Sequence, residues 1–160
     1  SESTGATTTI GIANAAAKLG FKTEFFSTCL GFNPAHFELD FYKKVTDGAQ
    51  KMEEKINRLR RECVNNGVIM QEKSVTLEEI QKKINKDCMA FILLDWGKII
   101  GKPYIGHFVP LVGFSDKQVY IHQPGPTDPT PNQPLSREQF EAARKARGTD
   151  EDIVFVHRKK

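Results

Sequence analysis

Apolar residues recur every three or four positions in several stretches of the chain, a spacing that is typical of helices with one buried face. In the longest of these stretches, Met52, Ile56, Leu59 and Cys63 form one stripe, and most other positions are charged or polar. Residues that cap helices, or glycines that end them, flank several of the stretches. We therefore expect helices over about 9–19, from position 34, over about 48–65, over about 76–84 and over about 136–147.

Other stretches combine β-branched and aromatic residues with alternating or continuous hydrophobicity, as strands do. The continuous apolar run 89–94 predicts a central strand that is covered on both faces. Further strands are expected at 21–27, 68–70, 104–114, 118–124 and 153–156. The segment 95–103 is expected as a loop, and the prolines and glycine of 124–132 predict an irregular surface segment. Because helices come first and strands cluster late in hairpins, the order favours an α+β fold with a mostly antiparallel sheet.

The late hairpin places candidate chemistry at its open end. If its loop is the three residues 115–117, Phe114 pairs with Gln118, and Gln123 lies diagonal to His107 on the same face. A two-residue loop would move Gln123 to the opposite face. A histidine oriented by a carbonyl oxygen is half of a nucleophilic site. We therefore predict His107 and Gln123 as a catalytic pair, against the common alternative that a lone histidine in a strand is structural.

Composition limits the class of protein. The chain has 160 residues, of which 39% are hydrophobic and 27% charged, values typical of one soluble globular domain. A net charge of +3 is too small to indicate binding to nucleic acid or membrane, and no apolar run approaches the roughly 20 residues of a membrane span. Three widely spaced cysteines form no disulfide framework, so we expect a cytoplasmic location. Residues 1–6 are expected to be a cloning remnant or a disordered start, 7–157 one domain and 158–160 a tail.

Other chemistries have weaker support in the sequence. Cys63 lies on a helical core stripe and Cys88 precedes a buried strand, so both are expected to pack in the interior. Cys29 lies in a loop, but no helix N-terminus stands behind it to lower its pKa. The segment 97–102 resembles a shortened phosphate-binding loop without the Ser or Thr that follows the lysine, and no His or Cys spacing fits zinc. We predict no metal and no cofactor.

Several motifs carry a family resemblance. The run Gly-His-Phe-Val at 106–109, with Gln123-Pro124 on the return strand, is similar to the Gly-His-aromatic-Val hairpin of peptidase C39-like, papain-like domains. The segment 28–34, Thr-Cys-Leu-Gly-Phe-Asn-Pro, and the segment 148–153, Gly-Thr-Asp-Glu-Asp-Ile, resemble the ends of one branch, the guanylyl cyclase domain-containing family. The resemblance covers about 10–156. It implies a papain-like fold in which helices pack on a mostly antiparallel sheet.

The same resemblance implies a catalytic cysteine in an Asp-Cys-Gly motif, followed by a histidine and an Asp or Asn. His107 matches the histidine, and Gln123 falls on the Asp/Asn position; a neutral amide stabilises an imidazolium less than a carboxylate does. The cysteine segment is expected upstream of this chain, on a catalytic helix that the domain here lacks.

Three functions stay open at this point: a cysteine-peptidase-like hydrolase of amides or esters, a non-catalytic module that binds a peptide or protein, and, from the family name alone, guanylyl cyclase activity. We expect a peptide or protein as substrate or partner, no nucleic acid and no membrane. A groove left by the missing helix favours association, including a homo-oligomer.

Overall fold

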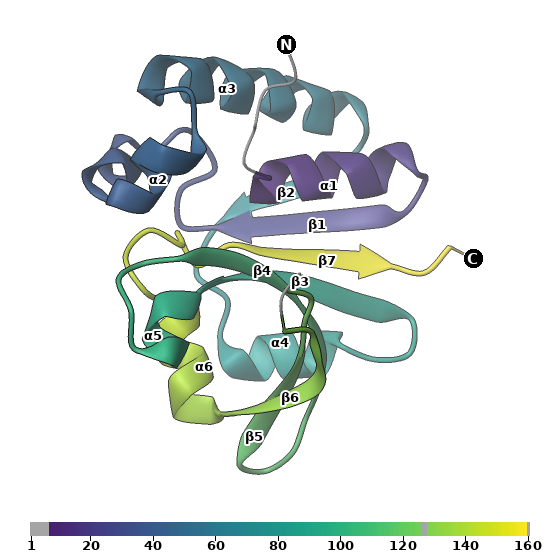
Figure 1. Ribbon diagram of the computed structural model, residues 1–160. Helices are drawn as coiled ribbons and strands as arrows, with labels where there is room; N and C mark the ends of the chain where they lie inside the picture. Colours follow the sequence, from purple (N-terminus) through teal and green to yellow (C-terminus); the bar gives the residue numbers. More distant parts are fainter. Residues whose placement is uncertain (1–6, 126–127, 160) are drawn as a thin grey trace.

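The computed structural model describes residues 7–125 and 128–159, which form a seven-stranded sheet with helices on both faces (Figure 1). The expected remnant or disordered start, 1–6, lies outside the described residues. The helices are α1 (Thr9–Lys18), the 3-10 helix η1 (Pro34–Glu38), α2 (Asp40–Val45), α3 (Ala49–Asn65), α4 (Leu77–Lys83), α5 (Trp96–Ile100) and α6 (Arg137–Arg144). The strands are β1 (Lys22–Ser27), β2 (Ile69–Glu72), β3 (Cys88–Asp95), β4 (Gly106–Phe114), β5 (Gln118–Gln123), β6 (Thr130–Ser136) and β7 (Ile153–His157).

The sheet has the strand order β2-β1-β7-β3-β4-β5-β6. Each neighbouring pair is antiparallel except β1 with β2, which is parallel. The α+β class is therefore confirmed, with a mixed sheet. The last strand, β7, lies in the middle, between β1 and β3 (Figure 1). This position brings the end of the chain beside its beginning, so the loop before β7 can contact the loop after β1.

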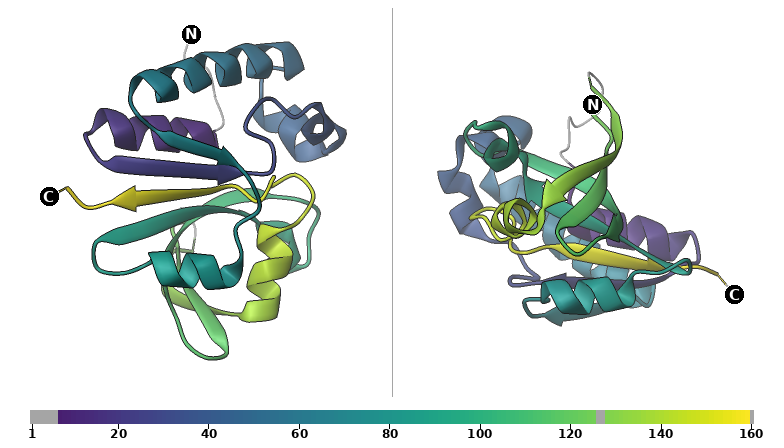
Figure 2. Two further views of the ribbon diagram at one scale, coloured as in Figure 1. Left: turned by 180° about the vertical axis from the view of Figure 1, so that it is seen from behind. Right: turned by 90° about the horizontal axis from the view of Figure 1, so that it is seen from below.

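Two hydrophobic cores lie on opposite faces of this sheet. Helices α1 and α3 cover one face, and α4 and α6 cover the other (Figures 1 and 2). In the first core, Leu59 and Cys63 of the predicted α3 stripe are buried against Ile10 and Ala13 of α1. The larger core includes Phe140 of α6, which is fully buried. The apolar faces of the predicted helices thus pack against the two faces of one sheet.

Local capping signals position several of these helices as the sequence predicts. The Thr8 hydroxyl accepts a hydrogen bond from the Gly11 amide, 3.1 Å away, at the start of α1. Reciprocal capping boxes open α4, between Thr76 and Glu79, and α6, between Ser136 and Gln139. These bonds satisfy amides that have no partner within the helix.

Two predictions for irregular segments are wrong. Within the expected loop 95–103, residues 96–100 form α5, which ends at Gly101 in the left-handed conformation with φ 71°. The expected irregular segment 124–132 overlaps β6, whose strand begins at Thr130 and includes Pro131 and Pro134. Prolines are tolerated there because β6 is an edge strand with only β5 beside it. Residues 126–127 of this segment lie outside the described residues.

Smaller differences concern where elements end. Helix α6 stops at Arg144 rather than at Arg147. The helix expected from position 34 is a 3-10 helix, opened by the Asn33 side chain that accepts from the Ala35 amide, and α2 follows it directly. These short helices carry the side chains that line one wall of the pocket described below.

Candidate functional site

His107 lies near the start of β4, beside the end of β3. Its backbone pairs with Leu94, and the neighbouring pair is Gly106 with Asp95. Trp96 is the first residue of α5. The centroid of its ring lies 5.3 Å from that of the His107 imidazole, and the two ring planes are inclined by 59°. The helix that replaces the expected loop therefore supplies one wall against the histidine.

Gln123, at the end of β5, meets the imidazole as predicted. Its Oε1 lies 2.9 Å from His107 Nε2. The predicted pairing of Phe114 with Gln118 is wrong, because Phe114 pairs with Val119. A bulge between Leu111 and Gly113 then shifts the register back by one residue. On the His107 side of this bulge the register is the predicted one, which is why the two side chains share a face.

The orientation of the Gln123 amide follows from its other partners. Oε1 also accepts a hydrogen bond from the Gly125 amide, at 2.5 Å, and Nε2 donates to the Asp128 carbonyl oxygen, at 2.9 Å. A carbonyl oxygen cannot donate, so His107 Nε2 must carry the proton that joins it to Oε1. The neutral ring then has its lone pair on Nδ1. This arrangement leaves Nδ1 able to accept a proton, as a general base must.

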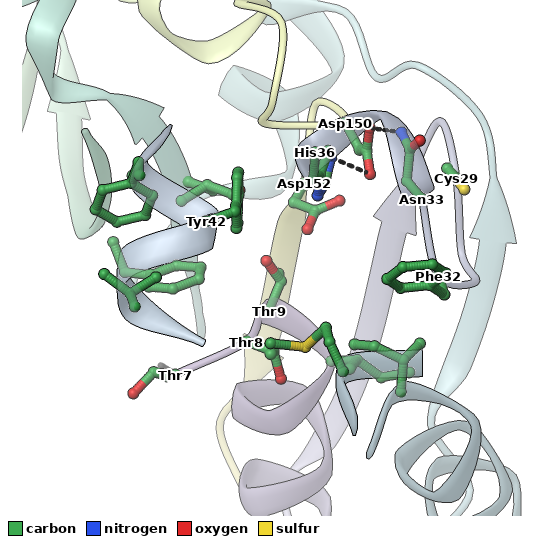
Figure 3. A pocket seen from close by; sticks show the side chains of 18 of the residues that line it. Thr7, Thr8, Thr9, Cys29, Phe32, Asn33, His36, Tyr42, Asp150 and Asp152 are labelled. Atoms are coloured by element: carbon green, nitrogen blue, oxygen red, sulfur yellow. Dashed lines mark hydrogen bonds and ion pairs between the residues drawn. The ribbon is translucent and has the colours of Figure 1, made fainter. Parts of the chain in front are cut away.

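A second polar cluster, which we call the acid corner, is formed by Thr9, Asn33, His36, Asp150 and Asp152 (Figure 3). Asp150 accepts from Asn33 Nδ2 at 2.8 Å and lies 2.9 Å from His36 Nε2. The loop backbone is anchored too, since the Thr28 amide donates to the Asp150 carbonyl oxygen at 2.8 Å. These contacts join the loop after β1 to the loop before β7.

Burial dominates the electrostatics of the acid corner. It raises the pKa of Asp152 to about 7, and the nearby Ser27 and Thr9 hydroxyls offset only part of that rise. Tyr42 stacks on His36 with ring centroids 4.7 Å apart, and burial raises the pKa of its phenol. Its hydroxyl donates to the Gly148 carbonyl oxygen. The corner therefore combines a His36–Asp150 contact with a carboxyl group, that of Asp152, which is poorly stabilised as an anion.

One pocket of about 700 Å³ joins the histidine of the hairpin to the acid corner. His107 and Gly106 line it from β4, and Cys29 lines it from the loop after β1. Apolar side chains supply much of the remaining wall: Phe25, Leu30, Phe32, Phe37, Phe41, Met52 and Ile56. An apolar cavity with a few converging polar groups is the usual form of a small-molecule or catalytic site.

None of the three cysteines has the lowered thiol pKa of an activated nucleophile. Cys63 and Cys88 are buried, as predicted, and burial raises the pKa of both thiols. Cys29 is half-buried, its Sγ lies 3.6 Å from the Gly31 carbonyl oxygen, and burial followed by the charge of Asp150 raises its pKa. Since the thiolate is the reactive form, a raised pKa disfavours attack by Cys29.

Neither a metal-binding cluster nor a membrane-spanning helix is found in the described part of the chain. Within residues 7–125 and 128–159, no group of three His, Cys, Asp or Glu side chains is placed to hold a metal ion. In the same part of the chain, no helix has the length and hydrophobicity to span a bilayer. Gly97, in the segment that resembles a phosphate-binding loop, packs against the Pro103 carbonyl oxygen, so close that a Cβ would lie 2.1 Å from it.

Comparison with known proteins places the chain in a family. A family model described as guanylylate cyclase matches residues 1–156. The chain belongs to this family. Another protein of similar sequence is Guanylyl cyclase 1 of Arabidopsis thaliana, which is 24% identical over 173 aligned residues covering 97% of this chain. This chain spans 61% of that protein's length. No solved structure matches the chain, so the papain-like architecture stays a prediction.

Sequence reasoning named the members of the hairpin pair but missed the acid corner. In the sequence, the segments 28–34 and 148–153 are motifs of the guanylyl cyclase domain-containing family; Asn33 is expected only to cap a helix, and no role is expected for Asp150 or Asp152. His36 was considered only for zinc, and Thr9 only as a helix cap. The signal that could have found them is the clustering of acids in 150–152 directly before a buried strand.

Proposed function

We propose that this member of the guanylylate cyclase family is the histidine-bearing part of a cysteine-dependent acyl hydrolase. His107 acts as the general base and Gln123 fixes its tautomer. The observation that supports this most is the hydrogen bond from His107 Nε2 to Gln123 Oε1, because it leaves Nδ1 free on a neutral ring. The thiol comes from a polypeptide segment that this sequence does not include, or from a partner chain.

The reaction proceeds in two balanced steps. His107 Nδ1 takes the proton of the cysteine thiol, and the thiolate attacks the carbonyl carbon of an amide or ester. The leaving amine or alcohol receives that proton as the acyl group becomes a thioester. Water then loses a proton to His107 and attacks the thioester, which releases the acid, and His107 returns the proton to the thiolate. Gln123 holds the ring in one orientation through both steps.

The pocket wall supports a peptide or another acyl compound with an apolar portion as the substrate. Phe41, Phe108 and Leu93 line the pocket beside His107, and their side chains offer apolar contact to the groups around a scissile bond. Gly106 provides no open space there, because a Cβ would lie 3.0 Å from the Phe41 ring. Substrate recognition next to His107 therefore depends on rings rather than on backbone access.

The test uses the natural full-length polypeptide and a cysteine-directed probe such as iodoacetamide. Because general base catalysis contributes roughly 10²–10⁴-fold, His107→Ala should slow probe labelling by about 100-fold or more. Gln123→Ala should give a smaller loss. His122→Ala is the matched control, since this exposed histidine lies on β5 next to Gln123 and should leave the rate unchanged. Labelling that is fast and independent of His107 would reject the proposal.

Two other functions give different outcomes. A non-catalytic module on the same fold would show no His107-dependent labelling but would still bind peptides. It draws support from the thiol pKa values of the three cysteines, all of which burial raises. Guanylyl cyclase activity is supported by the description of the family. Calorimetry with GTP and Mg²⁺ or Mn²⁺ tests it, and an absence of binding heat would remove it.

A further inference from the structure

The acid corner has no part in the acyl-transfer mechanism proposed above. Apart from Thr9 of α1, it is nevertheless built from two segments more than one hundred positions apart in sequence, and Asn33, Asp150 and Asp152 lie in motifs that carry the family resemblance. Asn33 and His36 hold Asp150, while Asp152 lies two residues further along at the entry to β7 (Figure 3). A structural purpose accounts for Asp150, whose contacts are complete. It does not account for Asp152.

Two buried oxygens of the corner lack partners. Among the described residues, neither Asp152 Oδ1 nor the Thr9 hydroxyl has a partner at hydrogen-bonding geometry, although the Thr9 hydroxyl lies close enough to lower the pKa of Asp152, and both atoms are shielded from solvent. Thr9 is only 4% exposed. Figure 3 shows the Thr9 hydroxyl and the Asp152 carboxyl directed toward the same space, one from α1 and the other from the start of β7. Leaving a buried polar group unpaired costs roughly 1–3 kcal/mol, so such a pair indicates an absent hydrogen-bond donor.

The charge around these oxygens selects a cation. The groups that line the pocket nearby are Asp150 from the loop before β7, His36 from η1, Cys29 from the loop after β1 and the exposed Lys44 of α2. The His36 ring already contacts Asp150. No described cation forms an ion pair with Asp152.

Apolar walls adjoin the corner. Leu30, Phe32 and Phe37 come from the segment after β1, and Met52 and Ile56 come from α3. All five side chains are partly exposed in the structure, although they belong to residue types that are favoured in interiors. The pocket thus offers an acidic end and an aromatic and aliphatic body within one volume of about 700 Å³.

We propose that this pocket binds an organic ammonium ion, with the ammonium group on Asp152 and Thr9 and an apolar body against the phenylalanines. The ammonium donates to the two unpaired oxygens, and its charge compensates the Asp152 carboxylate. Aromatic faces nearby add cation–π attraction. The proposal does not depend on the acyl-transfer mechanism, because binding needs neither His107 nor a thiol. A lysine side chain of a peptide and a free amine share this chemistry.

The test compares phenethylamine with 2-phenylethanol, a neutral compound of similar shape, by calorimetry at about pH 8. A charge-assisted hydrogen bond contributes about 1.5–3 kcal/mol, so the amine should bind at least about tenfold more tightly than the alcohol. Asp152→Asn should abolish this preference and leave binding of the alcohol unchanged. Asp116→Asn, which removes an exposed acid in the β4–β5 turn, is the charge-matched control and should keep the preference.

A second variant and a third compound test the two parts of the proposed site and the source of the amine. Thr9→Val keeps the side-chain volume and should weaken the amine alone by several-fold. N-acetyl-lysine methylamide tests the peptide source: binding that depends on Asp152 assigns a lysine side chain, and binding of phenethylamine alone assigns a free amine. Equal affinities for amine and alcohol would overturn the proposal, as would an unchanged preference in Asp152→Asn. Failure of all three compounds to bind at millimolar concentration would also overturn it.

Discussion

Replacing Gly125 with alanine should disrupt the His107–Gln123 pair without touching either residue. A Cβ at position 125 would lie 2.7 Å from Gln123 Nε2 and 2.8 Å from Oε1. Contacts under 3.0 Å require movement, and the Gln123 side chain is the group that can move. When it moves, it loses its hydrogen bonds to the Gly125 amide, to His107 and to the Asp128 carbonyl oxygen.

The magnitude follows from these three hydrogen bonds. Each contributes about 0.5–1.5 kcal/mol to folding when it is protected from water. Gln123 is only partly buried, so water replaces part of each bond, and we expect Gly125→Ala to lower the free energy of unfolding by about 1–2 kcal/mol. Urea denaturation followed by circular dichroism measures this value. Gly113→Ala, where a Cβ would meet nothing within 4 Å, is the control and should change stability by less than about 0.5 kcal/mol.

A double-mutant cycle isolates the cause. In a Gln123→Ala background the clash is absent, so Gly125→Ala should be neutral there, or stabilising through the unfolded chain. The expected coupling is therefore about 1–2 kcal/mol. A ¹⁵N spectrum of His107 gives an independent readout, because the Nε2–H tautomer should lose its preference in Gly125→Ala. Additive effects of the two substitutions, with an unchanged tautomer, would refute the reasoning.

Three other predictions concern buried charge and the site. Arg144 is fully buried and donates two hydrogen bonds to Glu141, of 2.7 and 3.0 Å. Arg144→Ala should therefore lower the free energy of unfolding, measured by urea titration, by about 3–5 kcal/mol. Arg147 is exposed, and Arg147→Ala should lower it by less than about 1 kcal/mol. Burial raises the pKa of Asp152 to about 7, above the ~3.9 of an unfolded aspartate, so the folded state holds the extra proton between these values. The stability of the wild type relative to Asp152→Asn should therefore fall as pH rises from about 4 to 7 and level off above, and a flat difference would contradict this. At about pH 8, Gln123→Glu should be less stable than the wild type by about 1 kcal/mol, as measured by thermal unfolding. This difference should shrink as the pH falls and the new carboxyl group becomes protonated.

The sequence was most informative where one physical rule determines the outcome. Alternation along a strand fixes which side chains share a face, so the hairpin could be predicted to bring Gln123 beside His107. The same reasoning failed near the turn, where Val112 is the extra residue of a bulge and changes the pairing. A bulge has no sequence signature in this hairpin. The prediction is correct at the open end because the bulge offsets the one-residue change in register at the turn, where the Ser115 amide bonds to the Gln118 carbonyl oxygen.

The acid corner and the edge strand could not be predicted by local rules. The position of β7 between β1 and β3 depends on which strands pair across the whole chain, and nothing in the segment 153–157 specifies its neighbours. Without that position, Asp150 and Asn33 are unrelated residues. The prolines of β6 argued against a strand, and only the location at the sheet edge makes them tolerable.

The surroundings of Gln123 are suited to an amide rather than to the acid that the family resemblance implies. Oε1 accepts from two N–H groups, while Nε2 donates to the carbonyl oxygen of Asp128. A carboxylate could replace the acceptor but would place its second oxygen against that carbonyl oxygen with no hydrogen between them, which is repulsive. The amide therefore fixes the imidazole at the expense of the extra stabilisation that a carboxylate gives an imidazolium. Such a pair makes the orientation of His107 dependent on the loop that supplies Gly125 and Asp128.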